Sequence, residues 1–186
     1  MKENNSQWEW KTLGEVCEIY NGSTPSRNKE KYWKNGQVPW FTIDDIREQG
    51  RKIKYTIQKI TEIALKETSV KMLPINTVLL CCTASIGEYA LTKIPLTTNQ
   101  QFNGLVIKKD YKEKILPDFL LLTCSKLSQE LSKFAGATSF KFVSVRNLSA
   151  IEIPVPPLPV QQRIVSLLEQ TERIKEKRKQ MDHFEI

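Results

Sequence analysis

A proline-rich junction near the end of the chain constrains the fold more than any other feature of the sequence. Residues 151–168 place Pro154, Pro156, Pro157 and Pro159 between an apolar run and an amphipathic segment. Proline fixes φ near about −65° and has no N–H to donate, so a strand that enters the junction must end there. The residues beyond favour an extended polyproline II path. The junction therefore predicts a stiff hinge between a globular body and a protruding helix.

The chain has 186 residues, which suits one domain of ordinary size with an appendage. We expect a body at residues 1–157 and a helical arm at residues 158–186. The hydrophobic fraction of 40% is enough for a core. No apolar run reaches the roughly 18 residues of a transmembrane helix. The N-terminal residues lack the apolar segment of a signal peptide, so we expect a cytoplasmic location.

Turn residues divide the body into short apolar runs and a few helical patterns. We expect a break at Asn21-Gly22, where the backbone tolerates positive φ, and a bulge at Asn103-Gly104. Because strands and helices do not alternate regularly, the pattern favours an α+β fold with a mixed, mostly antiparallel β body. Strands are expected at residues 16–20, 77–82, 88–92, 102–107 and 150–155, and short helices at residues 43–46, 61–66 and 143–148.

Two longer helices are expected towards the C-terminus. One begins near Pro117, a residue suited to a first helical turn, and ends at Gly136 as its C-cap. The other begins near Pro159 and is typical of a coiled coil, because apolar residues alternate spacings of four and three. Docking of this helix on its own domain is the alternative, and Thr171 and Arg178 weaken the seam. The expected partner face comprises Val160, Ile164, Leu167, Leu168, Thr171, Ile174 and Met181.

The sequence lacks the residue patterns of a catalytic or metal centre. Its single histidine, His183, lies beside the C-terminus, and no glycine-rich phosphate loop occurs. Asp44 and Asp45 suit capping or a surface role, and Asp118 suits the first turn of a helix. No Cys-x-x-Cys pair exists, so we expect buried reduced thiols at Cys17, Cys81, Cys82 and Cys124 and no bound metal.

The net charge of +7 favours a polyanionic partner such as nucleic acid, with a solvated basic face as the alternative. Several separated segments then resemble the specificity subunit of type I restriction–modification enzymes, and their order and spacing carry the likeness. They are Trp-Lys-Thr-Leu-Gly-Glu-Val-Cys-Glu-Ile-Tyr-Asn-Gly-Ser-Thr-Pro-Ser at 10–26, Tyr-Trp-Lys-Asn-Gly-Gln-Val-Pro-Trp at 32–40, Leu-Pro-Ile-Asn-Thr-Val-Leu at 73–79, Asn-Gln-Gln-Phe at 99–102 and Ile-Pro-Val-Pro-Pro-Leu-Pro-Val-Gln-Gln-Arg-Ile-Val at 153–165.

The resemblance implies a target recognition domain followed by a spacer helix, with no catalytic centre. Such a subunit reads double-stranded DNA and scaffolds methyltransferase (M) subunits, which bring S-adenosylmethionine and modify adenine. A restriction (R) subunit adds cleavage driven by ATP with Mg. The resemblance therefore implies no cofactor in this chain itself.

One departure concerns the number of recognition domains. The family usually carries two in tandem, each with a spacer helix, whereas this chain has one. It resembles a half-subunit or a fragment, so a full bipartite site needs a second copy, joined through the C-terminal helix as a homodimer, or the missing half. An interaction protein that binds methyltransferase subunits without productive DNA reading is the alternative.

The resemblance implies that polar side chains on loops meet the DNA. The loop at residues 23–34 is the first candidate, because basic and aromatic residues interleave there, and we expect binding to depend on Arg27 and Lys31. A solvated surface loop is the alternative, and Trp33 suits the core better than a base. The loop's candidate DNA contacts are Ser23, Thr24, Ser26, Arg27, Asn28, Lys29 and Lys31.

Further candidates come from three other loops, each with a structural alternative. The structural alternatives, in chain order, are an ordinary strand-end turn, amides that satisfy buried backbone groups, and a solvated loop after a helix. The basic cluster at residues 173–179 suits phosphates or a methyltransferase subunit, with a solvated helix face as its alternative. The candidate residues of the three loops are Thr83 and Ser85, then Asn99, Gln100 and Gln101, then Thr138, Ser139 and Lys141.

Overall fold

The computed structural model describes residues 8–83, 87–137 and 143–182. These residues form a mixed α+β fold in which most strand pairs are antiparallel, as the sequence predicts. Only two pairings, β3 with β8 and β4 with β7, are parallel among the described residues.

A five-stranded sheet forms the centre of the body. Its order is β2 (Cys17–Asn21), β9 (Phe102–Ile107), β6 (Val78–Cys81), β7 (Tyr89–Thr92) and β4 (Lys52–Ile53). The register of β9 with β2 and with β6 runs on through Asn103 and Gly104, so the expected bulge is wrong. Gly104 instead packs closely beneath Leu73, because a Cβ there would lie 2.6 Å from Leu73 Cδ1 and that side chain would have to shift.

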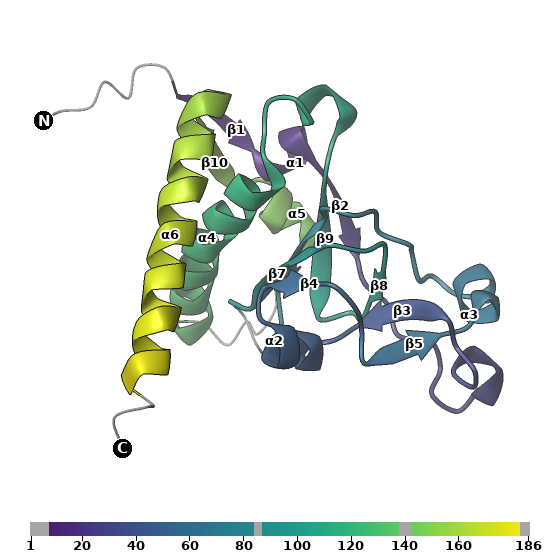
Figure 1. Ribbon diagram of the computed structural model, residues 1–186. Helices are drawn as coiled ribbons and strands as arrows, with labels where there is room; N and C mark the ends of the chain where they lie inside the picture. The colour runs from purple at the N-terminus through teal and green to yellow at the C-terminus, as the bar shows by residue number, and fades with distance from the viewer. Residues whose placement is uncertain (1–7, 84–86, 138–142, 183–186) are drawn as a thin grey trace, which may run out of the picture.

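Two smaller sheets flank the central one. β1 (Glu9–Thr12) pairs with β10 (Glu152–Val155). β10 leads into the proline junction, so the junction begins beside the first strand of the domain. The other sheet has the order β5 (Gln58–Ile60), β3 (Val38–Phe41) and β8 (Thr97–Thr98). Figure 1 places this sheet at the end of the molecule opposite the C-terminal helix.

The helices largely follow the sequence pattern. They are α1 (Leu13–Val16), α2 (Ile43–Gln49), α3 (Glu62–Glu67), α4 (Pro117–Ala137), α5 (Val145–Ser149) and α6 (Leu158–Asp182), with 3-10 turns η2 (Glu30–Tyr32) and η3 (Lys109–Tyr111). Asp45 caps α2, because its carboxylate accepts from the Thr42 N–H at 2.7 Å. The predicted C-cap at Gly136 is wrong, since α4 continues through that residue to Ala137. No described helix is long and apolar enough to cross a membrane.

The core lies on both faces of the central sheet. Leu80 and Cys82 pack on the side covered by α4, with Cys124 of that helix, whereas Leu79 and Cys81 pack on the other side. A strand buried on both faces explains the continuous apolar run in the sequence. All four cysteines are buried, as expected. Burial raises the pKa of Cys17 to about 12 and that of Cys82 to about 11, which keeps both thiols protonated at neutral pH.

β2 ends at Asn21, so the strand breaks where expected but not for the expected reason. Neither residue has positive φ; Asn35, with φ of 57°, has it instead. Gly22 is required by a close approach, because a Cβ there would lie 2.0 Å from the Asn99 carbonyl oxygen. This contact brings the loop after β2 against the turn before β9.

α6 is fixed to the body through one buried amide at its start. Gln161 is fully buried, and its Oε1 accepts from the Leu116 N–H at 2.9 Å. Its Nε2 donates to the carbonyls of Lys114 and Pro156, each at 2.7 Å. The amide therefore joins α6, the segment before α4 and the proline junction.

Replacing Gln161 with Ala should lower the free energy of unfolding by about 2 kcal/mol or more, because buried backbone groups lose their partners. Urea denaturation measures the change. Gln162→Ala is the matched control, since Gln162 is exposed, and its effect should stay within about 0.5 kcal/mol. Equal stability of the two variants would contradict the anchoring role of Gln161.

Candidate nucleic-acid interface

The loop at residues 23–34 lies between β2 and β3 and is built around a tight turn. The Lys29 N–H donates to the Ser26 carbonyl at 3.2 Å, which puts Arg27 and Asn28 at the corner. The loop returns to the sheet through Asn35, whose positive φ an asparagine tolerates. This geometry exposes the corner at the end of the molecule opposite α6 (Figure 1).

Two tryptophans hold the backbone of this loop. The Trp33 Nε1–H donates to the Ser26 carbonyl at 3.1 Å, and the Trp40 Nε1–H donates to the Ser23 carbonyl at 3.2 Å. The two rings meet edge to face with centroids 5.0 Å apart. Trp40 is buried on β3 and Trp33 is half-buried, so Trp33 packs as a structural residue rather than a free base contact.

Arg27 lies over both tryptophans. Its Cζ is 3.7 Å from the ring centroid of Trp33 and 4.7 Å from that of Trp40. Its Nη2 donates at 2.8 Å to Oε1 of Gln58, a residue of β5. The guanidinium is thus engaged within the protein on its face and at its edge.

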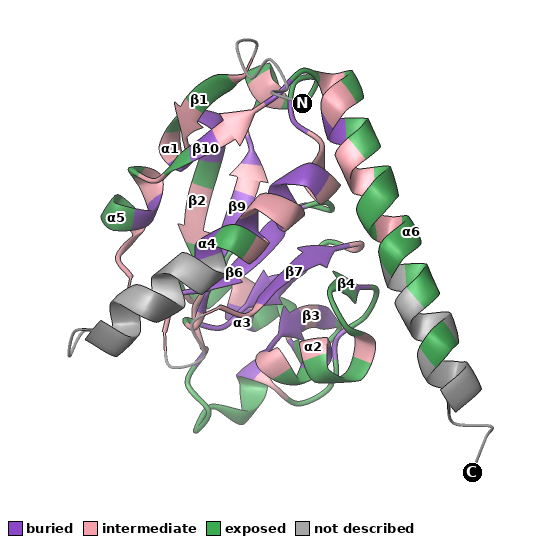
Figure 2. Ribbon diagram, turned by 90° about the vertical axis from the view of Figure 1, so that its left-hand side faces the viewer, coloured by how far each residue is buried: buried purple, intermediate pink, exposed green. Residues whose placement is uncertain are grey.

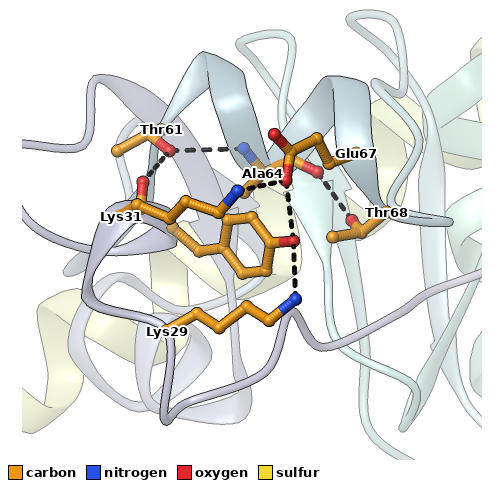
Figure 3. Close-up of polar contacts among 7 residues, drawn as sticks. Lys29, Lys31, Thr61, Ala64, Glu67 and Thr68 are labelled. Carbon is orange, nitrogen blue, oxygen red and sulfur yellow. Dashed lines mark hydrogen bonds and ion pairs between the residues drawn. The ribbon is translucent and has the colours of Figure 1, made fainter.

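Glu67 of α3 holds the other side of the loop (Figure 3). Its Oε2 accepts from Lys31 Nζ at 2.6 Å and from the Tyr32 hydroxyl at 3.0 Å. The hydrogen bonds from Lys31 and Tyr32 lower the pKa of Glu67, and the same carboxylate raises the pKa of Lys31. Thr61 adds a bond from its hydroxyl to the Lys31 carbonyl at 2.7 Å.

The turn before β9 lies beside this loop. Thr24 donates to Gln100 Oε1, and the hydroxyls of Ser23 and Ser69 share a hydrogen bond of 2.8 Å. Asn99 is buried, and its Oδ1 accepts from the Gln101 N–H at 3.0 Å. This contact favours the alternative in which the amide satisfies a backbone group rather than binding DNA. Gln100 remains exposed.

The remaining sequence candidates are not all placed. Thr83 is half-buried and follows Cys82, whose N–H donates to the Gln101 carbonyl at 3.0 Å, so it lies near the same turn. Ser85, Thr138, Ser139 and Lys141 lie outside the described residues.

Sequence reasoning missed the supports of the loop. Gln58, Glu67 and Ser69 reach it from residues 31 to 46 positions away in the chain. No local spacing marks such partners. A hint lies in Trp33 and Trp40, whose N–H groups need acceptors when buried.

Fewer basic side chains of the loop lack a carboxylate partner than its composition suggests. Lys34 pairs with Glu30 at 2.7 Å, and Lys31 pairs with Glu67. Within the described part of the chain, Lys29 has no carboxylate within 4.0 Å. Among the same described residues, no group of three His, Cys, Asp or Glu side chains could hold a metal ion. The loop therefore offers a surface for binding, with an amide and a cation at its corner.

Part of α6 faces its own domain, which favours the docking alternative for that part of the helix. Val165 and Leu168 face a cleft of about 470 Å³ that Leu121 and Leu122 of α4 also line. Lys52 closes this side with contacts to Glu169 at 2.8 Å and Asp118 at 3.2 Å.

The seam residues differ in exposure along α6. Val160 and Ile164, near its start, are half-buried, whereas Leu167 is 54% and Ile174 is 55% exposed. Thr171 is exposed too, and the side chain of Met181 lies outside the description. Figure 2 shows α6 as a mostly exposed arm.

Comparisons with known proteins agree with the resemblance in the sequence. The family model described as Type I restriction modification DNA specificity domain matches residues 5–181. The EcoprrI specificity subunit of Escherichia coli is 36% identical over 168 residues, covering 87% of this chain and 41% of that protein. The MjaIX specificity subunit of Methanocaldococcus jannaschii is 32% identical over 178 residues, covering 95% and 40%. The chain thus spans about two fifths of the length of these relatives.

Solved structures share the fold. The HsdS subunit from Thermoanaerobacter tengcongensis aligns with a TM-score of 0.71 at 23% identity, covering 94% of this chain and 40% of that one. A chain of a type I R-M system, solved to explain its assembly and conformational transition, aligns with a TM-score of 0.73 at 24% identity, covering 95% and 42%.

Replacing Glu67 with Gln should destabilise the protein slightly at neutral pH, because the pairing with Lys31 is lost. The pKa of Glu67 lies below its ordinary 4.5, so this contribution is present above that value and lost as the pH falls through the folded pKa. The gap in melting temperature between wild type and variant should therefore close under acid conditions. Glu113→Gln is the control at an exposed position. A gap that persists in acid would contradict the ion pair.

Proposed function

The chain belongs to the type I restriction modification DNA specificity family, and we propose that it reads DNA sequence without catalysing a reaction itself. Because it spans about two fifths of its relatives, we further propose that it supplies one recognition domain, at residues 1–157, and reads one half of a bipartite site. Residues 158–186 then serve as the spacer arm.

The observation that carries this proposal is the braced loop at residues 23–34. Sequence is read by side chains that reach base edges, and the amide of an asparagine suits adenine in the major groove. Loops on a rigid support are the usual carriers of such contacts. Gln100, which Thr24 contacts, and Thr83, which follows a residue bonded to Gln101, extend the proposed surface, to which we also assign Ser85, Thr138, Ser139 and Lys141.

The arm suits a spacing role. Its 25 residues, at about 1.5 Å each, span about 38 Å, close to one DNA turn of about 34–36 Å. We propose that its exposed apolar face pairs as a coiled coil with the arm of a second copy or with a missing half. Methyltransferase subunits carrying S-adenosylmethionine, and a restriction subunit using ATP and Mg, then assemble on the resulting pair in the cytoplasm.

Methylome sequencing tests this function most directly. Cells that contain the cognate methyltransferase subunit are compared with and without the gene for this chain. We expect one bipartite adenine motif to lose its methylation when the gene is removed. An unchanged methylome would reject the proposal, and binding of the methyltransferase subunit without preference among DNA duplexes would favour the interaction-protein alternative.

Replacing Leu167 and Ile174 together with Ser should weaken self-association of the chain about tenfold or more, because both side chains are exposed on the proposed pairing face. Sedimentation equilibrium measures the association constant. Gln170→Ser controls for the effect of serine on the helix, since Gln170 is exposed and polar. A wild-type chain that stays monomeric at high concentration would contradict pairing through this face.

A further inference from the structure

The corner of the loop carries two side chains in opposite situations. Arg27 folds back over Trp33 and Trp40 and donates to Gln58. Asn28, at the neighbouring corner position, is exposed, and its amide makes no hydrogen bond to any residue that the structure describes. The amide keeps two donors and one acceptor oxygen available for a ligand.

Arg27 is exposed at the corner, but its contacts with both rings and its hydrogen bond to Gln58 hold the guanidinium against the loop. Use of the whole guanidinium on a base edge would require it to leave these partners. The tryptophans also hold the loop backbone through the Ser23 and Ser26 carbonyls, so the same movement would disturb the frame. Arg27 is therefore better suited to bracing the loop than to reading a base.

The lysines of the loop divide in the same way. Lys31 contacts Glu67 at 2.6 Å and Lys34 contacts Glu30 at 2.7 Å, so both charges are partly neutralised. Lys29 is exposed, and its Nζ lies 3.5 Å from the Tyr32 hydroxyl, at the limit of a hydrogen bond. The Nζ atoms of Lys29 and Lys31 each lie 5.3 Å from the centroid of the Tyr32 ring, but only Lys31 also contacts Glu67.

We propose that Asn28 reads a base edge and Lys29 contacts an adjacent phosphate, while Arg27 and Lys31 are positioning residues that hold the loop. This division rests on the proposed DNA-reading function and assigns its contacts. It replaces the sequence-based expectation that Arg27 and Lys31 themselves carry the binding.

The three roles leave different signatures in binding data. Loss of a base contact relaxes preference at one base pair, by about tenfold for a good amide–adenine pair. Loss of a phosphate contact weakens all sequences alike and lowers the slope of log affinity against log salt by about 0.9. Loss of a brace weakens all sequences alike, leaves the salt slope unchanged and loosens the loop in the free protein.

The experiment measures binding of the full chain and its variants to a randomised duplex library at several salt concentrations. Asn28→Ala should lose preference at one position, and Lys29→Gln should lower the salt slope, whereas Lys34→Gln, a matched lysine, should change neither. Arg27→Met and Lys31→Met should weaken all sequences at an unchanged slope. In the free protein both should also speed cleavage after Glu30 by a glutamate-specific protease, and Asn28→Ala should not.

Unchanged preference at every position in Asn28→Ala would overturn the assignment of the reader. Relaxed preference at one base pair in Arg27→Met, with cleavage after Glu30 as slow as in the wild type, would overturn that of the brace. A wild-type chain with no sequence preference would reject the proposed function and the reader with it. The cleavage rates of free Arg27→Met and Lys31→Met would still decide whether these residues brace the loop.

Discussion

The buried amide of Gln161 is the contact on which the arrangement of the molecule depends. It joins the first turn of α6 to the segment before α4 and to the carbonyl of Pro156, so the proline junction cannot turn freely. Lys52 adds a second tie two turns later, by its contact to Glu169. Together they set the direction in which the arm leaves the body, while its later residues remain exposed.

At the other end of the body, side-chain hydrogen bonds rather than a sheet hold the loop in place. The loop at residues 23–34 has few ladder hydrogen bonds, yet Trp33 and Trp40 hold its backbone and Glu67 pairs with its Lys31. A preorganised loop loses less conformational entropy when it binds a ligand. Basic residues in a loop are therefore not all available to a polyanion, because some of them hold the loop in shape.

The fold thus separates two tasks in one chain. The braced loop and the arm lie at opposite ends of the body (Figure 1). Family membership makes the first a proposed reading surface and the second a proposed spacer. Because the central sheet, packed on both faces, and α4 lie between them, the distance between the two ends is set by packing rather than by a flexible linker.

The sequence by itself determined the elements whose signals are local. The apolar run at residues 77–82 predicted a buried strand, the periodic face after Pro117 predicted α4, and the proline cluster predicted the start of α6. Only the tertiary structure decided what the polar side chains do. Arg27 is a brace because Trp40 and Gln58 reach it from β3 and β5, and Gln161 is an anchor because Leu116 lies beside it. Periodicity records which face of an element is apolar, but a hydrogen-bond partner distant in sequence is fixed only when the sheets and helices pack.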